Sequence, residues 1–291
     1  MIKNANPPER PKRRWTPWKV FFLSFGLLVV LVVLLVTFAG IRFSVLARNR
    51  IEVQMAAMRE AGEPTTPAEL EAYYRLPPDV EDTTALWMEA TALLDTPEFE
   101  SDAGDLPIVG TGESEIPPPG EPWDDLEAVE ELLGKYRASM ELMHRATDAG
   151  GAARYPTDFD QGLMMLLEHA QRLRGGARML SLEAHVRAHR GDPAGAARSI
   201  RAILTLARSL KREPVLVSML VRIACEGIAL WQLEDLLGAV DFSEEDLIEF
   251  QEKLRAADYA ENLYVAMLGE RVIVVTAIED PTTQGIDGPR G

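Results

Sequence analysis

Residues 20–41 form an unbroken stretch of 22 residues without a charged side chain (VFFLSFGLLVVLVVLLVTFAGI). At a rise of about 1.5 Å per residue, a helix of that length spans roughly 33 Å, which is enough to cross the hydrocarbon core of a bilayer. Trp15 and Trp18 precede it, where an interfacial aromatic belt is expected. The alternative is a signal peptide cleaved after Thr37-Phe38-Ala39, but the apolar run exceeds the roughly 7–15 residues of a signal-peptide core. We therefore predict an uncleaved transmembrane helix over residues 20–41, with the lipid bilayer as one partner of the chain.

Basic residues gather in front of this stretch. Six of them precede it: Lys3, Arg10, Lys12, Arg13, Arg14 and Lys19. Because loops rich in Lys and Arg stay in the cytoplasm, we expect residues 1–19 to form a cytoplasmic tail. The domain then lies outside, on the outer face of a bacterial inner membrane. Arg42, Arg48 and Arg50 follow the helix closely, so a cytoplasmic domain remains the alternative.

The remainder of the chain is strongly acidic. Seven of the 30 basic residues and one of the 46 acidic residues lie within residues 1–42, so the rest holds 23 basic and 45 acidic residues and carries a net charge of −22. Such a charge is a poor match for nucleic acid, which we exclude as a partner, and it favours basic protein partners. The chain has one cysteine, Cys225, which allows neither an intramolecular disulfide nor a thiolate metal cluster.

Helical signals follow the predicted anchor over residues 42–94. A helix from Ser44 to Ala61 is expected to stop at Gly62. Thr66-Pro67-Ala68-Glu69 combines an N-cap, a proline at the first helical position and the glutamate of a capping box. Residues 83–94 suggest a further helix. Residues 95–122 are rich in proline, glycine and acids without periodicity, and predict one long surface loop, with short ordered pieces near residues 106–109.

Residues 123–279 have the periodicity of a helical bundle. The cleanest pattern steps by three and four residues and consists of Leu163, Leu166, Ala170, Leu173, Ala177, Leu180 and Ala184. This predicts a helix-packing seam in which Gly175-Gly176 permits close approach or a kink. Residues 214–237 are apolar over most of a helix circumference and predict the central helix. Residues 272–278 also fit a short strand, and residues 280–291 are expected to be a disordered tail.

Turns and caps delimit the later helices. Arg190-Gly191-Asp192-Pro193 predicts a turn, and a helix follows to about Lys211. Ser243 with Asp246 and Asp258 with Glu261 are typical of helix N-termini.

Few residues suggest specific chemistry. His185 and His189 are four apart, as in zinc-binding helices, but Val186 stands where the metalloprotease motif needs glutamate. Polar positions on a helix surface are therefore the simpler interpretation. Arg222 and Glu226 lie four apart on the most apolar helix, which predicts a structural ion pair, with a functional polar site as the alternative. With no nucleophile elbow, P-loop or dinucleotide fingerprint in the sequence, we predict no catalytic residue, no cofactor and no metal.

Two resemblances add to this interpretation. The segment from Arg178 to Arg212 resembles a tetratricopeptide-type helical hairpin, with Ala184, Gly191-Asp192 and Ala196 at roughly the expected offsets. Arg187 stands where an aromatic residue is usual, and no second copy follows at a fixed period.

Residues 62–271 also resemble a family of bacterial single-pass envelope proteins that has no assigned activity. The segments that carry this resemblance are PDVEDTTALWMEA (78–90), LPIVGTGESEIPPPGEPW (106–123), RYPTDFDQGLMMLLEHAQRLRGGAR (154–178) and EPVLVSMLVRI (213–223). It implies an anchored, extracytoplasmic helical domain and implies no catalytic residue.

The expected fold is all-α: a transmembrane helix, then an irregular helical bundle with tetratricopeptide-like hairpins and one long loop. The favoured function is a tethered protein-interaction module of the envelope. The first alternative is an envelope hydrolase with Arg154, Asp158, His169 and Arg174 gathered near the loop. It requires these side chains to meet in one pocket with perturbed titration. The second is a structural subunit of a membrane complex, which requires a large exposed apolar patch.

Overall fold

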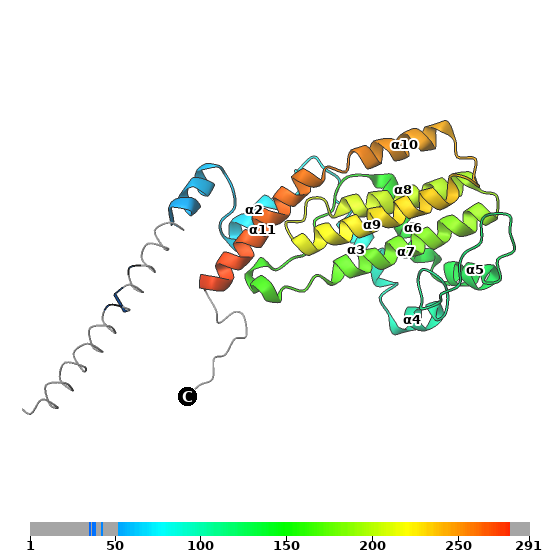
Figure 1. The fold of residues 1–291 in the computed structure, drawn as a ribbon, viewed down its shortest axis with the longest axis horizontal. Coiled ribbons are helices and arrows are strands. Elements are labelled where there is room, and N and C mark those ends of the chain that lie inside the picture. The colour runs from blue at the N-terminus through cyan, green and yellow to red at the C-terminus, as the bar shows by residue number, and fades with distance from the viewer. Residues whose placement is uncertain (1–34, 36, 39–41, 43–51, 280–291) are drawn as a thin grey trace, which may run out of the picture. The chain divides into compact units, whose positions relative to one another are not determined.

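The computed structural model describes Leu35, Thr37, Phe38, Arg42 and residues 52–279 (Figure 1). In these residues every regular element is helical, and the one strand-like pairing is an isolated bridge between Asp82 and Ala152. The predicted all-α class is therefore confirmed for the described part of the chain. The alternative of a strand over residues 272–278 is wrong, because these residues belong to the last helix.

The chain divides into two compact units, residues 1–62 and 63–291. In the first unit, residues 52–60 are helical and the chain turns at Gly62, whose φ of 75° favours glycine. The predicted tail over residues 1–19, most of the predicted transmembrane helix over residues 20–41, and the predicted C-terminal tail over residues 280–291 lie outside the described residues.

The second unit begins at Glu63. The helices of residues 63–94, predicted to be separate from the bundle of residues 123–279, therefore belong to the same unit as that bundle. Its described helices, in chain order, are α2 (Pro67–Tyr73), α3 (Thr84–Ala92), α4 (Pro97–Ala103), α5 (Leu126–Lys135), α6 (Arg137–Ala149), the 3-10 helix η1 (Phe159–Met164), α7 (Glu168–His189), α8 (Pro193–Ser209), α9 (Leu216–Leu236), α10 (Glu244–Arg255) and α11 (Tyr259–Glu279).

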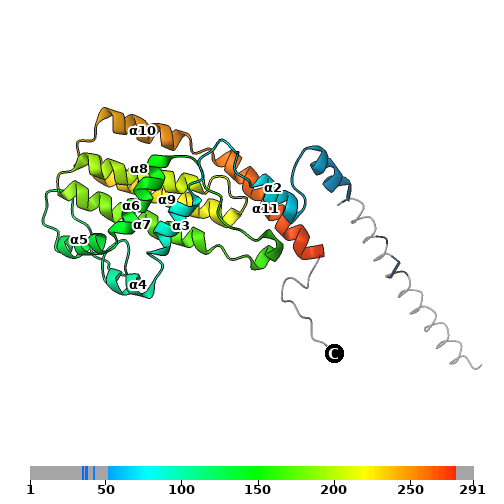
Figure 2. The same ribbon diagram turned by 180° about the vertical axis from the view of Figure 1, so that it is seen from behind.

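Helices α7, α8 and α9 form the centre of this unit and pack on one another (Figures 1 and 2). Helices α3 and α6 pack beside them, α10 lies along α8, and α11 packs on α9, α2 and η1. Leu173, Leu180, Ile203 and Leu206 are fully buried between the central helices. Burial of each such side chain stabilises the fold by about 1.5–3 kcal/mol.

Local sequence signals set most helix starts. The Thr66 hydroxyl accepts the Glu69 backbone N–H at 3.2 Å, and Glu69 reaches back to Thr65 at 2.7 Å, one residue before the expected partner. The predicted turn before α8 is confirmed, with Asp192 accepting the Gly195 N–H at 2.8 Å. The predicted caps of α10 and α11 form as well: Ser243 accepts from the Asp246 backbone N–H and Asp258 from that of Glu261.

The predicted seam is confirmed from Ala170 onwards and wrong before it. Ala170, Leu173, Ala177, Leu180 and Ala184 are fully buried on α7. Two leucines that the pattern included, Leu163 and Leu166, are 61% and 74% exposed. The reason is Gly162, whose φ of 53° and ψ of −127° interrupt the helix, so that α7 begins only at Glu168.

Glycines allow two close approaches. A Cβ on Gly176 would lie 3.1 Å from both Met143 and Thr91, so this glycine serves the close packing of α7, which runs through Gly175-Gly176 as one helix. In α11, a Cβ on Gly269 would lie 1.6 Å from the carbonyl oxygen of Pro214. Glycine at that position lets α11 cross the chain immediately before α9.

The segment of residues 95–122 is more ordered than the sequence suggests. Thr96 accepts the Phe99 N–H at 3.1 Å and starts α4, whose residues Phe99 and Ala103 join the core. The prediction of a single loop missed this helix because its seven residues are too short to show periodicity. The rest of the segment has no regular secondary structure.

Candidate functional site

The polar residues predicted near the loop have separate structural roles. Arg154 pairs with Glu71 and lies over the ring of Tyr74, 5.4 Å from its centroid. Asp158 is exposed and caps η1, where it accepts from the Asp160 backbone N–H at 3.2 Å. Asp158 therefore fixes the chain locally, whereas Arg154 joins its segment to the end of α2.

His169 belongs to a closed network. Its Nε2 lies 2.8 Å from Oε1 of Glu213, whose side chain is fully buried, and its ring stacks on Tyr155 with centroids 4.8 Å apart. The Tyr155 hydroxyl lies 2.6 Å from the Ser209 hydroxyl, and burial raises the pKa of Tyr155 above its usual range. These groups bind one another, and the His169 side chain is only 6% exposed, which leaves little room for a substrate.

Arg222 and Glu226 form the ion pair that their spacing predicts. The two side chains are almost completely buried, and Arg222 Nε donates to Glu226 at 2.9 Å. The Tyr259 hydroxyl donates to the same carboxylate, and burial followed by that hydrogen bond raises the pKa of Tyr259 to about 12. Arg222 also donates to Asn262 on α11 at 3.2 Å. Arg174, the remaining candidate, is half-buried and has no ion pair within the described residues.

The requirement set for the hydrolase is therefore not met. Arg154 and Asp158 are engaged with different neighbours, and His169 is sealed against Glu213. None of the cavities described below is lined by any of these four residues, so their contacts give the hydrolase no support.

A second buried network is not predicted from the sequence. His144 and Ser199 both contact the Glu183 carboxylate, at 2.7 and 2.8 Å. Burial would raise the pKa of Glu183, but the hydrogen bond from His144, the charge on His144 and the bond from Ser199 together hold it below its usual value. In a hydrolytic triad the histidine must contact the serine, whereas here both contact the carboxylate. The three residues lie far apart in the sequence, so their spacing does not predict that they meet.

The prediction that His185 lies on the helix surface is wrong. Its side chain is fully buried instead of lying on the helix surface, and neither ring nitrogen has a hydrogen-bond partner within the described residues. Burial, and to a lesser degree His189, lowers the pKa of His185 to about 4. His189 faces elsewhere and lies 2.8 Å from the carbonyl oxygen of Pro117. Among the described residues, no three His, Cys, Asp or Glu side chains are grouped as ligands for a metal ion.

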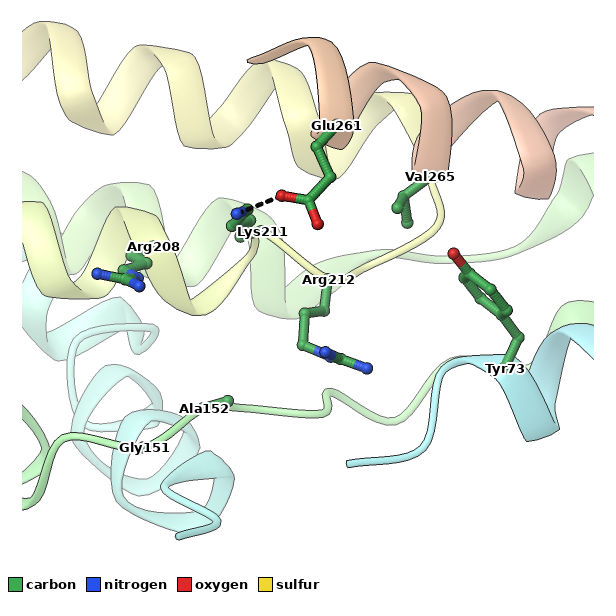
Figure 3. Close-up of a pocket in the computed structure, with 8 residues that line it drawn as sticks. All are labelled: Tyr73, Gly151, Ala152, Arg208, Lys211, Arg212, Glu261 and Val265. Atoms are coloured by element: carbon green, nitrogen blue, oxygen red, sulfur yellow. Dashed lines mark ion pairs between the residues drawn. The ribbon is translucent and has the colours of Figure 1, made fainter. Parts of the chain in front are cut away.

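A cavity of about 370 Å³ lies beside the end of α8 (Figure 3). Its lining consists of Tyr73, Gly151, Ala152, Arg208, Lys211, Arg212, Glu261 and Val265. Three of these residues are basic and one is acidic, in a chain with a net charge of −16. Arg208, Lys211 and Arg212 lie within five residues of one another, which is the sequence signal that could have located this cavity.

The outward side of α9 is apolar. Seven exposed uncharged residues, hereafter the α9 face, each lie three or four positions from at least one other member: Val217, Leu220, Ile223, Ala224, Gly227, Leu230 and Trp231. The five large side chains among them are 39–56% exposed. Within the described residues α9 is also the one helix long and apolar enough to cross a membrane, and half of its most apolar part is buried inside the protein.

Comparison of the chain with protein-family models, with curated proteins and with solved structures finds no match.

Proposed function

We propose that this chain is a membrane-anchored protein-interaction domain of the bacterial envelope, and that the α9 face is its docking surface. The face carries the proposal because it presents seven uncharged residues over four helical turns, a length of about 21 Å. Contiguous exposed apolar patches are uncommon on monomeric domains and often mark interaction sites. Anchor residues at this spacing are those by which one helix binds an apolar groove or another helix.

The charges beside the α9 face define the partner. Glu234 and Asp235 are exposed and follow the face directly, whereas Arg222, the one basic residue of α9, is buried. A complementary partner presents an apolar helix or groove with basic residues at the end that meets Glu234 and Asp235. The overall acidity of the chain favours the same sign of partner.

The location of the domain follows from the sequence and forms part of the proposal. Residues 20–41 anchor the chain in the inner membrane, residues 1–19 stay in the cytoplasm, and the acidic domain lies outside the cytoplasm. The burial of Arg222 and Glu226 against α11 supports α9 as a core helix of that domain instead of a second span.

The finer description of the fold is also a proposal. Helices α7 and α8 pack on each other and are joined by the Gly191-Asp192-Pro193 turn, which supports the proposal of a tetratricopeptide-like hairpin. Such units commonly present extended surfaces to other proteins. Here α9 covers one side of the hairpin and presents its own far side instead.

A permanent structural subunit of a membrane complex is the second candidate, because the α9 face also meets its requirement for an exposed apolar patch. The two candidates differ in the lifetime of the complex. A subunit copurifies with its partners at fixed stoichiometry, whereas an interaction module exchanges them.

Proximity labelling of the full chain in its native cell tests the proposal, with Leu220→Glu/Leu230→Glu as the variant. Leu247→Glu/Ile248→Glu on α10 is the matched control, since these leucine and isoleucine side chains are 38% and 50% exposed. We expect the α9 variant to lose a specific envelope protein that the control and the wild type retain. We also expect Glu234→Lys/Asp235→Lys to weaken its labelling.

The identity of that protein decides the outcome. A protein with an apolar segment ending in basic residues supports the proposal, and removal of residues 1–42 should abolish its labelling. Equal labelling by the α9 variant and the α10 control would contradict it. Labelling of the chain by its own second copy would replace the proposed partner with a homodimer.

A further inference from the structure

The cavity beside the end of α8 has the charge of an anion site. Lys211 is paired with Glu261, whose Oε2 lies 2.5 Å from its Nζ. Arg208 has no ion pair within the described residues, and the contact of Arg212 is a marginal one of 3.5 Å with the Arg75 carbonyl. Two guanidinium groups that have no carboxylate partner in the described part of the chain thus border one cavity, although the sequence has 46 acidic residues. Figure 3 shows Arg212 extending between Ala152 and Tyr73.

A second cavity continues the first. It has a volume of about 260 Å³ and shares Gly151, Ala152 and Arg208 with the first cavity. It adds Lys253 from α10, together with four hydroxyl groups, those of Thr83, Thr147, Thr205 and Ser209. Arg208 therefore borders both cavities. The four hydroxyl groups each donate to a backbone carbonyl, and Lys253 pairs with Glu249 at 3.6 Å. These groups thus shape the second cavity and leave Arg208 as its one cation without an ion pair in the part of the chain that the structure describes.

The walls of this double cavity are held in place. The Lys211 carbonyl oxygen accepts from Asn262 at 2.8 Å, which joins the end of α8 to α11. On the opposite wall, the Ala152 N–H donates to the Glu81 carbonyl at 3.0 Å and Thr83 donates back to Ala152. Gly151 permits this close approach, since a Cβ there would lie 2.2 Å from the Glu81 carbonyl oxygen. Because the walls are fixed, the basic groups stay apart even when no ligand is bound. Binding a ligand then costs less conformational entropy.

Stabilisation of the helix end explains only part of this arrangement. Basic residues near a helix C-terminus interact favourably with the helix dipole, and Arg208 lies in the last turn of α8. Lys253 lies in the last turn of α10 and pairs with Glu249 at 3.6 Å, which accounts for it without a ligand. Arg212 lies beyond the end of α8 and has no ion pair within the described residues, so neither explanation accounts for its place at the cavity.

We propose that this double cavity binds the phosphate group of a small anion, with Arg208 and Arg212 as the principal ligands and Lys211 as a third once Glu261 yields it. Guanidinium groups suit phosphate because their planar donors match its oxygens in pairs. The phosphate belongs either to a soluble phosphate ester or to a lipid headgroup. This site is separate from the α9 face and does not depend on the proposed docking function.

Calorimetric titration of the full chain in neutral detergent with inorganic pyrophosphate tests the site. We expect saturable binding that Arg208→Gln/Arg212→Gln weakens at least about tenfold. The control is Arg178→Gln/Arg255→Gln, which removes two exposed arginines elsewhere and leaves the affinity nearly unchanged. Glu261→Gln should tighten binding about threefold or more, because it removes the acid of the cavity and frees Lys211.

Each remaining outcome has a meaning. No saturable binding, an equal effect of the two double variants, or weaker binding by Glu261→Gln would overturn the proposal. A parallel titration with vesicles that contain phosphatidic acid identifies the source of the phosphate. Binding to vesicles that depends on Arg208 and Arg212 and exceeds binding to pyrophosphate assigns a lipid headgroup, and the reverse order assigns a soluble ester. Unchanged thermal unfolding of the variants shows that both arginines act on the ligand and not on the fold.

Discussion

Arg222 on α9 donates a hydrogen bond from Nη1 to the side-chain oxygen of Asn262 on α11, over 3.2 Å. The amide nitrogen of Asn262 in turn donates to the Lys211 carbonyl at the end of α8. One buried arginine thereby links α9 to the first turn of α11 and, through Asn262, to the residues that follow α8. The charge that most disturbs the apolar pattern of α9 is satisfied by its own helix and by α11, and it fixes one wall of the basic cavity.

Removing one member of the Arg222–Glu226 pair should destabilise the fold more than removing both. Arg222→Met leaves a buried carboxylate without its cation and should cost about 3–5 kcal/mol. In Arg222→Met/Glu226→Leu no buried charge remains, so the loss should be clearly smaller than the sum of the two single changes. Urea unfolding of the full chain in neutral detergent, followed by circular dichroism, measures both. Additive losses would show that the two side chains are not coupled.

Acid should weaken the fold through His185. The pKa of this residue is about 4 in the folded chain, against 6.5 as its ordinary value, because the ring is buried. Between these values the unfolded chain binds more protons, so stability falls as the pH falls from 6.5 towards 4. The Asp235 carboxylate, 3.8 Å from Nδ1, opposes the effect, and His189 adds to it.

The test compares the wild type with His185→Leu, whose side chain does not titrate. Between pH 7 and pH 5 the wild type should lose about 2 kcal/mol more than the variant. With His185 present, Asp235→Asn should enlarge the loss of stability between pH 7 and pH 5, because it removes the carboxylate that favours the protonated ring. Equal pH dependence of the wild type and His185→Leu would mean that His185 does not control this window.

Two glycine substitutions should change the free energy of unfolding in opposite directions. Gly269→Ala places a Cβ against the Pro214 backbone and should lower the free energy of unfolding by more than about 3 kcal/mol. Gly175→Ala, in the interior of α7 with no neighbour within 4 Å of its Cβ, should raise it by about 0.5–1 kcal/mol. Thermal unfolding of both variants beside the wild type is sufficient. A tolerated Gly269→Ala would contradict the close crossing of α11 and the start of α9.

Single-cysteine labelling tests the proposed topology. The native Cys225 gives little background, because it is buried and burial raises its pKa to about 12. In cells with a permeabilised outer envelope, an impermeant maleimide should label Ser101→Cys, an exposed position of α4. Asn4→Cys should be labelled only after lysis. Reversed labelling would place the acidic domain in the cytoplasm.

The sequence predicts the helices well where caps and periodicity agree. Thr66, Asp192 and Ser243 cap α2, α8 and α10 because a hydroxyl or carboxylate oxygen can take an unpaired N–H of the first turn. It fails where one residue changes the backbone. Gly162 breaks the apolar pattern before α7, and no periodicity reveals that Leu163 and Leu166 face solvent.

At the candidate sites, too, local contacts could be predicted and contacts between distant residues could not. The Arg222–Glu226 pair is local and could be predicted, because both residues lie on one helix turn. The contact of His144 with Glu183 and that of His169 with Glu213 span 39 and 44 residues, so they depend on tertiary packing that spacing does not encode. The same holds for the cavity at Arg208, whose far wall comes from residues 151–152. Its basic run was visible, but its surroundings were not.

Site-specific photocrosslinking tests the docking surface most directly. A photoreactive residue replaces Leu230 on the α9 face or, in the control, Ile248 on α10, which have nearly equal exposures of 48% and 50%. The proposed function predicts one discrete adduct from position 230 in native membranes, absent from position 248 and weakened by Glu234→Lys/Asp235→Lys. Equal, diffuse labelling from both positions, or an adduct that ignores the charge reversal, would contradict it.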